Sequence, residues 1–103
     1  MKGKPYSIEI SDEAECDFDN SYNYYFAESP KVADAFFQRI SISFKSIETI
    51  PLSFPEVYKS VRKFTVKKFP FVIYFQVKES TVKVIAIFHT SRNPEIWNER
   101  VDE

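Results

Sequence analysis

Residues 71–89 read FVIYFQVKESTVKVIAIFH, two strongly apolar runs separated by the polar pair Glu79-Ser80. Both runs are rich in β-branched and aromatic side chains, which favour strands. The two-residue gap has the length of a tight hairpin, although it lacks the glycine or asparagine that such turns prefer. We predict two antiparallel strands, the second central and buried on both sides. Its alternation places Val82, Val84, Ala86 and Phe88 on one face and Ile85 and Ile87 on the other.

Two helices are predicted upstream, because apolar residues recur there every three or four positions. Ser11 is placed to cap a helix over residues 12–28, and Ser29 to cap a second helix that starts at Pro30 and ends near Ile50. A one-residue break between them makes a helical hairpin. The expected apolar stripes are Ala14, Phe18, Tyr22 and Tyr25 on the first helix, and Ala33, Phe36, Phe37, Ile40, Phe44 and Ile47 on the second.

The remaining segments complete the fold prediction. Residues 6–10 alternate as a short first strand, residues 51–55 form a proline-flanked break, and residues 58–66 form a basic strand. Residues 95–101 are predicted to form one short helix. The expected architecture is α+β in the order β-α-α-β-β-β, a single domain over residues 1–103 with the helical hairpin on one face of a mainly antiparallel sheet. The other face is expected to be partly exposed and available for binding.

Composition excludes several classes of protein. One cysteine, Cys16, and one histidine, His89, cannot form the usual multi-ligand zinc site, and a single glycine, Gly3, excludes the glycine-rich nucleotide loops. We therefore expect no metal and no cofactor. No apolar run approaches the ~18 residues of a membrane span, and the first residues are not typical of a signal peptide, so we expect a cytoplasmic protein that does not enter a membrane.

Charge is unevenly distributed along the chain. Residues 1–30 hold two lysines against seven acidic residues, whereas residues 31–103 hold twelve basic residues against eight acidic ones. The basic strand and its flanks could bind an acidic partner, or could only protect a sheet edge from aggregation. Its five cations are Lys59, Arg62, Lys63, Lys67 and Lys68.

Three segments together resemble the RelE/ParE superfamily of toxins from bacterial type II toxin–antitoxin modules. They are residues 6–14 (YSIEISDEA), 61–75 (VRKFTVKKFPFVIYF) and 84–97 (VIAIFHTSRNPEIW). The first is similar to the opening strand and capped helix of the family, and the second to its arginine-bearing strand and "FP" turn. The third, a closing strand followed by a His-x-x-Arg element, is the most specific.

The resemblance implies one of two activities. RelE-like members are ribosome-dependent mRNA endonucleases, whereas ParE-like members lack that catalytic set and are associated with inhibition of DNA gyrase. It also implies a cognate antitoxin whose C-terminal segment wraps the toxin in a groove of the helices and sheet, the two proteins assembling as an oligomer. Modules of this kind stabilise plasmids and inhibit growth.

A ribonuclease needs a general acid or base and cations for the phosphate. By resemblance, the candidates here are His89, Arg92 and Arg62. The aromatic residue that follows Pro94 is Trp97, which cannot transfer a proton as Tyr or His could. This departure favours the ParE-like branch, in which Arg62, Lys63, Arg92 and Trp97 would contact the partner or target.

These residues also have local interpretations. His89 could hydrogen-bond the turn that carries Arg92, and Arg92 could pair with Glu95, Glu99 or an acidic residue of the first helix. Trp97 could anchor the end of the chain on the sheet. The leading hypothesis is a ParE-like toxin that binds a target such as gyrase without catalysis. The alternatives are a RelE-like endonuclease and a non-toxic relative that only binds proteins.

Overall fold

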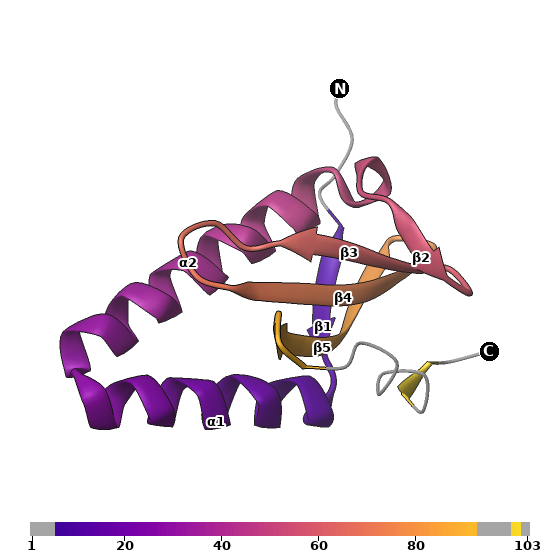
Figure 1. Ribbon diagram of the computed structural model, residues 1–103. Helices are drawn as coiled ribbons and strands as arrows, with labels where there is room; N and C mark the ends of the chain where they lie inside the picture. Colours follow the sequence, from indigo (N-terminus) through magenta and orange to yellow (C-terminus); the bar gives the residue numbers. More distant parts are fainter. Residues whose placement is uncertain (1–5, 93–99, 102–103) are drawn as a thin grey trace.

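The predicted elements occur in the predicted α+β order, and the sheet contains one additional strand. The computed structural model describes residues 6–92 and 100–101. Over these residues a sheet of five strands has the order β1-β5-β4-β3-β2, in which β1 is parallel to β5 and all other neighbours are antiparallel (Figure 1). The elements are β1 (Ser7–Ile10), α1 (Asp12–Glu28), α2 (Pro30–Thr49), the 3₁₀ turn η1 (Pro51–Ser53), β2 (Glu56–Tyr58), β3 (Val61–Thr65), β4 (Phe71–Lys78) and β5 (Thr81–His89).

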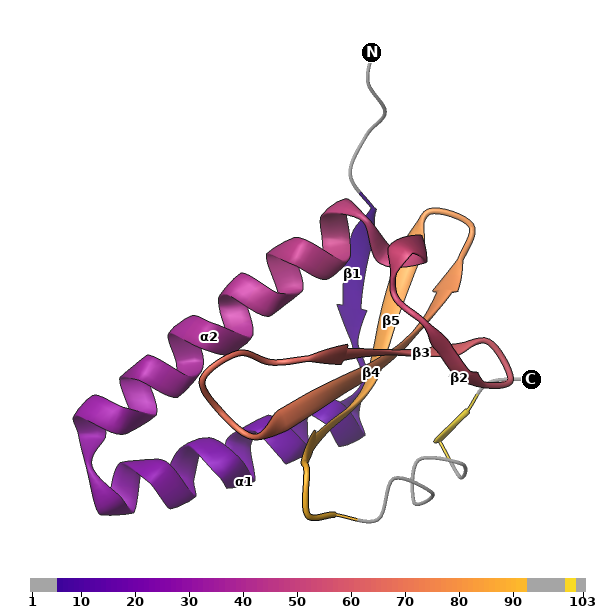
Figure 2. The same cartoon turned by 45° about the horizontal axis from the view of Figure 1, so that its top comes forward.

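The two helices form the predicted hairpin. The Ser11 Oγ accepts a hydrogen bond from the backbone N–H of Ala14 at 3.1 Å, and the Ser29 Oγ accepts one from Val32 at 3.4 Å. Ser29 is at once the last cap of α1 and the first cap of α2. Both views show the helices meeting at this joint and spreading apart like a V (Figures 1 and 2).

The main core lies between the helices and one face of the sheet. Apolar side chains of α1 and α2 pack on alternate residues of β4 and β5, which removes their surface from water and stabilises the fold. Phe36 is at its centre, with ring contacts to Phe71 at 4.9 Å and Tyr25 at 5.1 Å. The buried members are Ala14, Phe36, Ile40, Ile47, Val66, Phe71, Ile73, Phe75, Val82, Val84 and Ile87.

The predicted alternation of β5 is wrong after Val84, because the strand contains a bulge there. Phe75 pairs with Val84 and Tyr74 pairs with Ala86, so Ile85 is an extra residue without a partner opposite it. One inserted residue shifts every later side chain to the other face. The helix-facing side of β5 therefore carries Val82, Val84 and Ile87, whereas Ile85, Ala86 and Phe88 face away from the helices.

The segment predicted as one basic strand, residues 58–66, instead contains the turn of a hairpin between β2 and β3. Tyr58 pairs with Val61 across a turn at Lys59 and Ser60, whose φ angles are 42° and 65°. Both residues lie in the left-handed region that glycine and asparagine usually occupy, so the turn has no sequence signal. The strand predicted from Tyr58 begins instead at Val61, and β2 is an additional edge strand.

The face away from the helices is less open than predicted. A second apolar cluster covers its centre and is buried, with Val72 and Val101 packed against it. Apolar side chains are stabilised when they are removed from water, and Val101, near the end of the chain, covers part of this cluster. Its buried members are Val61, Tyr74, Ile85, Ala86 and Phe88.

Candidate functional site

The outer edge of β5 is completed by side chains. β1 pairs with β5 only as far as Val84, and among residues 6–92 and 100–101 no strand pairs with the rest of this edge. The Ile87 backbone N–H donates to Asp17 Oδ2 at 3.0 Å, and the Ile85 carbonyl accepts from Arg100 Nη1 at 3.0 Å. Asp17 and Arg100 thus satisfy backbone groups that a further strand would otherwise pair.

The same two side chains form a buried ion pair. Arg100 Nη1 lies 2.7 Å from Asp17 Oδ2, and Nη2 lies 3.4 Å from Oδ1, so the guanidinium approaches both carboxylate oxygens. The Asp17 side chain is 6% exposed and that of Arg100 is 14% exposed. Such charge-assisted, two-pronged bonds fix geometry, and this pair ties α1, β5 and the end of the chain together.

Arg92 joins this cluster from its open side. Its Nη1 is 3.4 Å from Asp17 Oδ1, and its guanidinium carbon lies 4.1 Å from the ring centre of Phe88. The Arg92 side chain is 40% exposed, so it offers further donors to solvent or to a partner. The interpretation that Arg92 pairs with an acidic residue of the first helix is confirmed.

His89 is engaged by its own turn. Its Nδ1 accepts the backbone N–H of Ser91 at 3.0 Å and lies 2.8 Å from the Ser91 Oγ, while its carbonyl accepts the N–H of Arg92 at 2.9 Å. The ring meets Phe71 edge-on at 5.3 Å between centres. This confirms that His89 hydrogen-bonds the turn that carries Arg92.

A hollow of about 490 Å³ adjoins His89. Tyr24 and Tyr25 contribute from α1, and Tyr25 also packs on the core, as its helical position predicts. Burial, with a smaller contribution from the neighbouring Tyr24, raises the pKa of the Tyr25 phenol. This phenol therefore stays protonated at neutral pH. Tyr25 is thus not placed to act as a general base beside His89 in a ribonuclease reaction.

Arg62 and Lys63 point to opposite faces of β3. The Arg62 Nη1 donates to the carbonyls of Phe54 at 2.6 Å and Leu52 at 3.3 Å, which ties η1 to the sheet. Lys63 pairs in register with Tyr74 on the face away from the helices and is exposed. Of the two, Lys63 is therefore the more accessible cation.

The three candidate catalytic residues do not converge. His89 pairs with Phe71 of β4, whereas Arg62 pairs with Phe75, four residues further along that strand. At ~3.3 Å per residue this separates them by roughly 13 Å along the strand alone. Arg92 lies on the Phe88 face, away from the side on which His89 meets Phe71. Trp97 and most of the predicted final helix lie outside the described residues.

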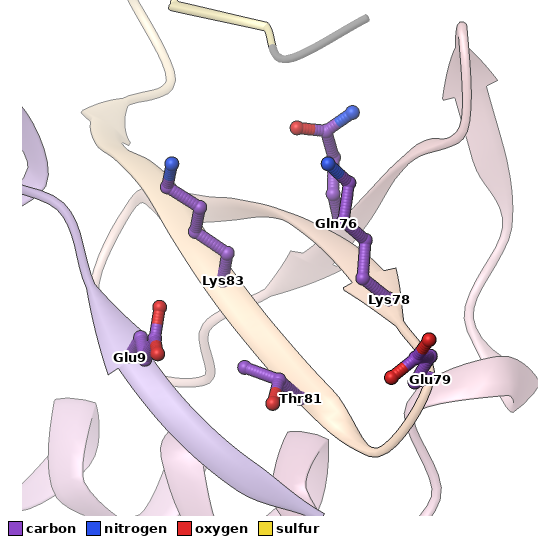
Figure 3. A pocket seen from close by; sticks show the side chains of 6 residues that line it. All are labelled: Glu9, Gln76, Lys78, Glu79, Thr81 and Lys83. Carbon is purple, nitrogen blue, oxygen red and sulfur yellow. The ribbon is translucent and has the colours of Figure 1, made fainter.

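A polar hollow lies beside the turn that joins β4 and β5 (Figure 3). Its volume is about 560 Å³, and Lys83 and Lys78 rise into it from β5 and β4 with Gln76 beside them. Glu9 of β1 pairs in register with Lys83, so the charges there are mixed. This hollow and Arg92 mark two polar regions on either side of the buried cluster.

Sequence reasoning missed the central role of Asp17 and Arg100. Asp17 does carry a signal, because it falls three residues after Ala14 and one before Phe18, inside the apolar stripe of α1. A carboxylate on a core-facing stripe needs a buried partner. Arg100 carries no such signal, since nothing in the local sequence connects it with β5.

The two-helix hairpin on a five-stranded mixed sheet is the α+β arrangement that the resemblance to the RelE/ParE superfamily implies. The profile of the family described as "ParE toxin of type II toxin-antitoxin system, parDE" matches residues 8–94. The chain therefore belongs to the ParE toxin family of type II toxin–antitoxin systems.

A solved structure described as "Chromosomal ParDE TA system from P. aeruginosa" has the same fold. Its TM-score is 0.73 at 24% sequence identity, and the match covers 82% of this chain and 95% of that chain. A search of curated proteins found no match. Within the described part of the chain, no helix is both long and apolar enough to cross a membrane.

Proposed function

We propose that this protein arrests growth by binding a cellular target in the cytoplasm, with DNA gyrase as the first candidate, and that a cognate antitoxin neutralises it. Membership of the ParE toxin family supports the proposal. The similar fold comes from a structure described as a ParDE system, which supports an antitoxin as partner.

The observation that carries the proposal is the separate engagement of His89, Arg62 and Arg92. Each is held by a different local partner: the Ser91 turn, the Phe54 carbonyl and the Asp17 carboxylate. A nuclease of the RelE type would need these groups around one phosphate. Their separation favours binding over cleavage.

Two of the predicted contact residues are accessible for binding. Arg92 is stacked on Phe88 and keeps part of its guanidinium exposed, and Lys63 is exposed on the same face of the sheet. Both would pair with acidic groups of a partner or target. We also retain Arg62 and Trp97 as proposed contacts.

Replacing Arg92 with alanine is expected to weaken antitoxin binding or gyrase inhibition about tenfold, which corresponds to about 1.4 kcal/mol. The domain should stay folded, because Arg100 still pairs with Asp17. The measurements are antitoxin affinity by titration calorimetry and supercoiling of relaxed plasmid by purified gyrase.

Lys45→Ala is the matched control, since it removes one positive charge from an exposed position of α2. Its affinity and its inhibition of supercoiling should equal those of the wild type. If Arg92→Ala behaves like this control in both assays, Arg92 is not a contact residue. If the wild-type protein causes no growth arrest when it is expressed without antitoxin, it is a non-toxic relative.

A further inference from the structure

The two flanks of helix α2 differ in character. The flank towards α1 is apolar. Phe37 belongs to the predicted buried stripe, but it is 48% exposed on this flank and meets Phe18 edge-on at 6.2 Å. The flank towards β3 borders a small hollow of about 230 Å³, which Arg39, Ile42, Ser43 and Ser46 line from the helix. Their spacing of three or four residues places these four side chains on one face of α2.

The sheet leaves this hollow open to solvent. β2 pairs with β3 only at Val61 and Arg62. Among the described residues no strand pairs with the outer edge of β3 at Phe64 and beyond. Phe64 is therefore only partly buried, and it lines the hollow opposite α2 together with Lys67 of the loop that follows β3.

The two cations of the hollow have no carboxylate beside them. Within residues 6–92 and 100–101, the charged groups of Arg39 and Lys67 form no ion pair and no hydrogen bond. None of the described residues that line the hollow is acidic. The hollow of Figure 3 differs in this respect, because Glu9 and Glu79 line it beside its lysines. Two positive charges without a counter-charge in one hollow attract an anion.

The hydrogen-bond donors of the hollow suit a phosphate group. A guanidinium presents several N–H groups in a fixed fork, and a lysine adds a compact positive charge. The Ser43 hydroxyl already donates to the Arg39 carbonyl at 2.8 Å, whereas the Ser46 hydroxyl forms no hydrogen bond within the described part of the chain. A phosphate monoester carries nearly two negative charges at neutral pH, which matches the two cations better than a carboxylate does.

The size and the charge of the protein favour a small ligand over a nucleic acid. The hollow is smaller than the ~300–1,000 Å³ of pockets that enclose a whole drug-sized ligand, so it would enclose the phosphate and leave the rest outside. Ile42 is 52% exposed and offers apolar surface to that remainder. A nucleic acid is held by contacts to many phosphates, whereas this chain has a net charge of −1.

We propose that the hollow lined by Arg39, Ser46 and Lys67 binds the phosphate of a small phosphate monoester, such as a nucleoside monophosphate. The organic part of the ligand lies on Ile42 and Phe64. Such a ligand joins α2 to the loop that follows β3, and it stabilises the folded chain by binding to it. The assignment is independent of the proposed function, because none of these residues is a proposed contact for the antitoxin or the target.

The test is a titration of the isotope-labelled full chain with adenosine monophosphate, followed through the chemical shifts of its backbone amides. The shifts should be confined to residues 39–46 and 64–68. Inorganic phosphate should move the same amides, and adenosine should not. Arg39→Gln and Lys67→Gln should each weaken the binding of adenosine monophosphate about tenfold. Circular dichroism should show that both variants stay folded, since neither side chain is buried.

Lys68→Gln is the matched control, because it removes the same charge from the next residue of the same loop, outside the hollow. Its affinity should equal that of the wild type. If Lys67→Gln and Lys68→Gln weaken binding equally, the attraction is diffuse and the assignment is wrong.

Two further outcomes would overturn the assignment. One is a titration with adenosine monophosphate that moves no amide around the hollow. The other is a short DNA duplex that moves these amides when adenosine monophosphate does not, which would make the hollow a contact for nucleic acid. None of these results bears on the proposed function, because that function is measured with antitoxin and gyrase.

Discussion

Replacing Asp17 with alanine is expected to lower the free energy of unfolding by about 3 kcal/mol, and the melting temperature by roughly 15 °C. The substitution removes the acceptor of the Ile87 N–H and the partner of the Arg100 guanidinium, both in a largely buried environment. The substitution leaves the largely buried charge of Arg100 without this partner. The resulting loss of stability exceeds the net contribution of the intact ion pair. Urea and thermal unfolding followed by circular dichroism measure the effect.

The control is Glu13→Ala, an exposed acidic position on the same helix. Its free energy of unfolding should stay within about 0.5 kcal/mol of the wild-type value. Equal unfolding midpoints for Asp17→Ala and Glu13→Ala would show that the cluster of Asp17, Arg92 and Arg100 does not hold the end of the chain to α1 and β5.

Replacing Phe36 with alanine is expected to lower the free energy of unfolding by about 4 kcal/mol. Phe36 is 0% exposed, and its ring contacts those of Phe18, Tyr25, Phe69 and Phe71. This loss has two parts. The free energy gained by burying a large ring away from water is lost, and a cavity remains because α2 cannot close it. For a domain of this size, that is a large share of a typical total stability of about 5–15 kcal/mol.

Phe37→Ala provides a sharp comparison, because the neighbouring ring is half exposed. It should lower the free energy of unfolding by less than about 1 kcal/mol. If both substitutions lower stability equally, the assignment of Phe36 to the core and Phe37 to the surface is incorrect.

Local sequence signals predicted most of the fold. Ser11 and Ser29 marked where the helices begin, and the apolar runs gave β4 and β5 their bounds. The turn at Lys59 and Ser60 escaped prediction because neither residue is one that the left-handed region favours.

The bulge at Ile85 also escaped prediction, because an apolar run has no mark for an inserted residue. It reversed the faces assigned to Ala86 and Phe88 relative to Val84. This matters for the site, because Phe88 is the surface on which Arg92 stacks.

The candidate site was predictable only in its local parts. His89 and Ser91 are two residues apart, so their bond could be expected from the turn. The pairing of Asp17 with Arg100 spans 83 residues and depends on where β1 ends, which is a property of the assembled sheet. Sequence periodicity contains no information on contacts of this range.

We propose above that the protein acts by binding a target and not by cutting RNA. The most direct test of this claim is primer extension on an mRNA that is being translated in a cell-free extract, with purified wild-type protein or His89→Gln added. We predict full-length message with both proteins, because His89 is held by Ser91 and lies apart from Arg62. Cuts that appear only during translation, and that fall ~10²–10⁴-fold in rate with His89→Gln, would contradict the claim and make the protein a ribosome-dependent endonuclease.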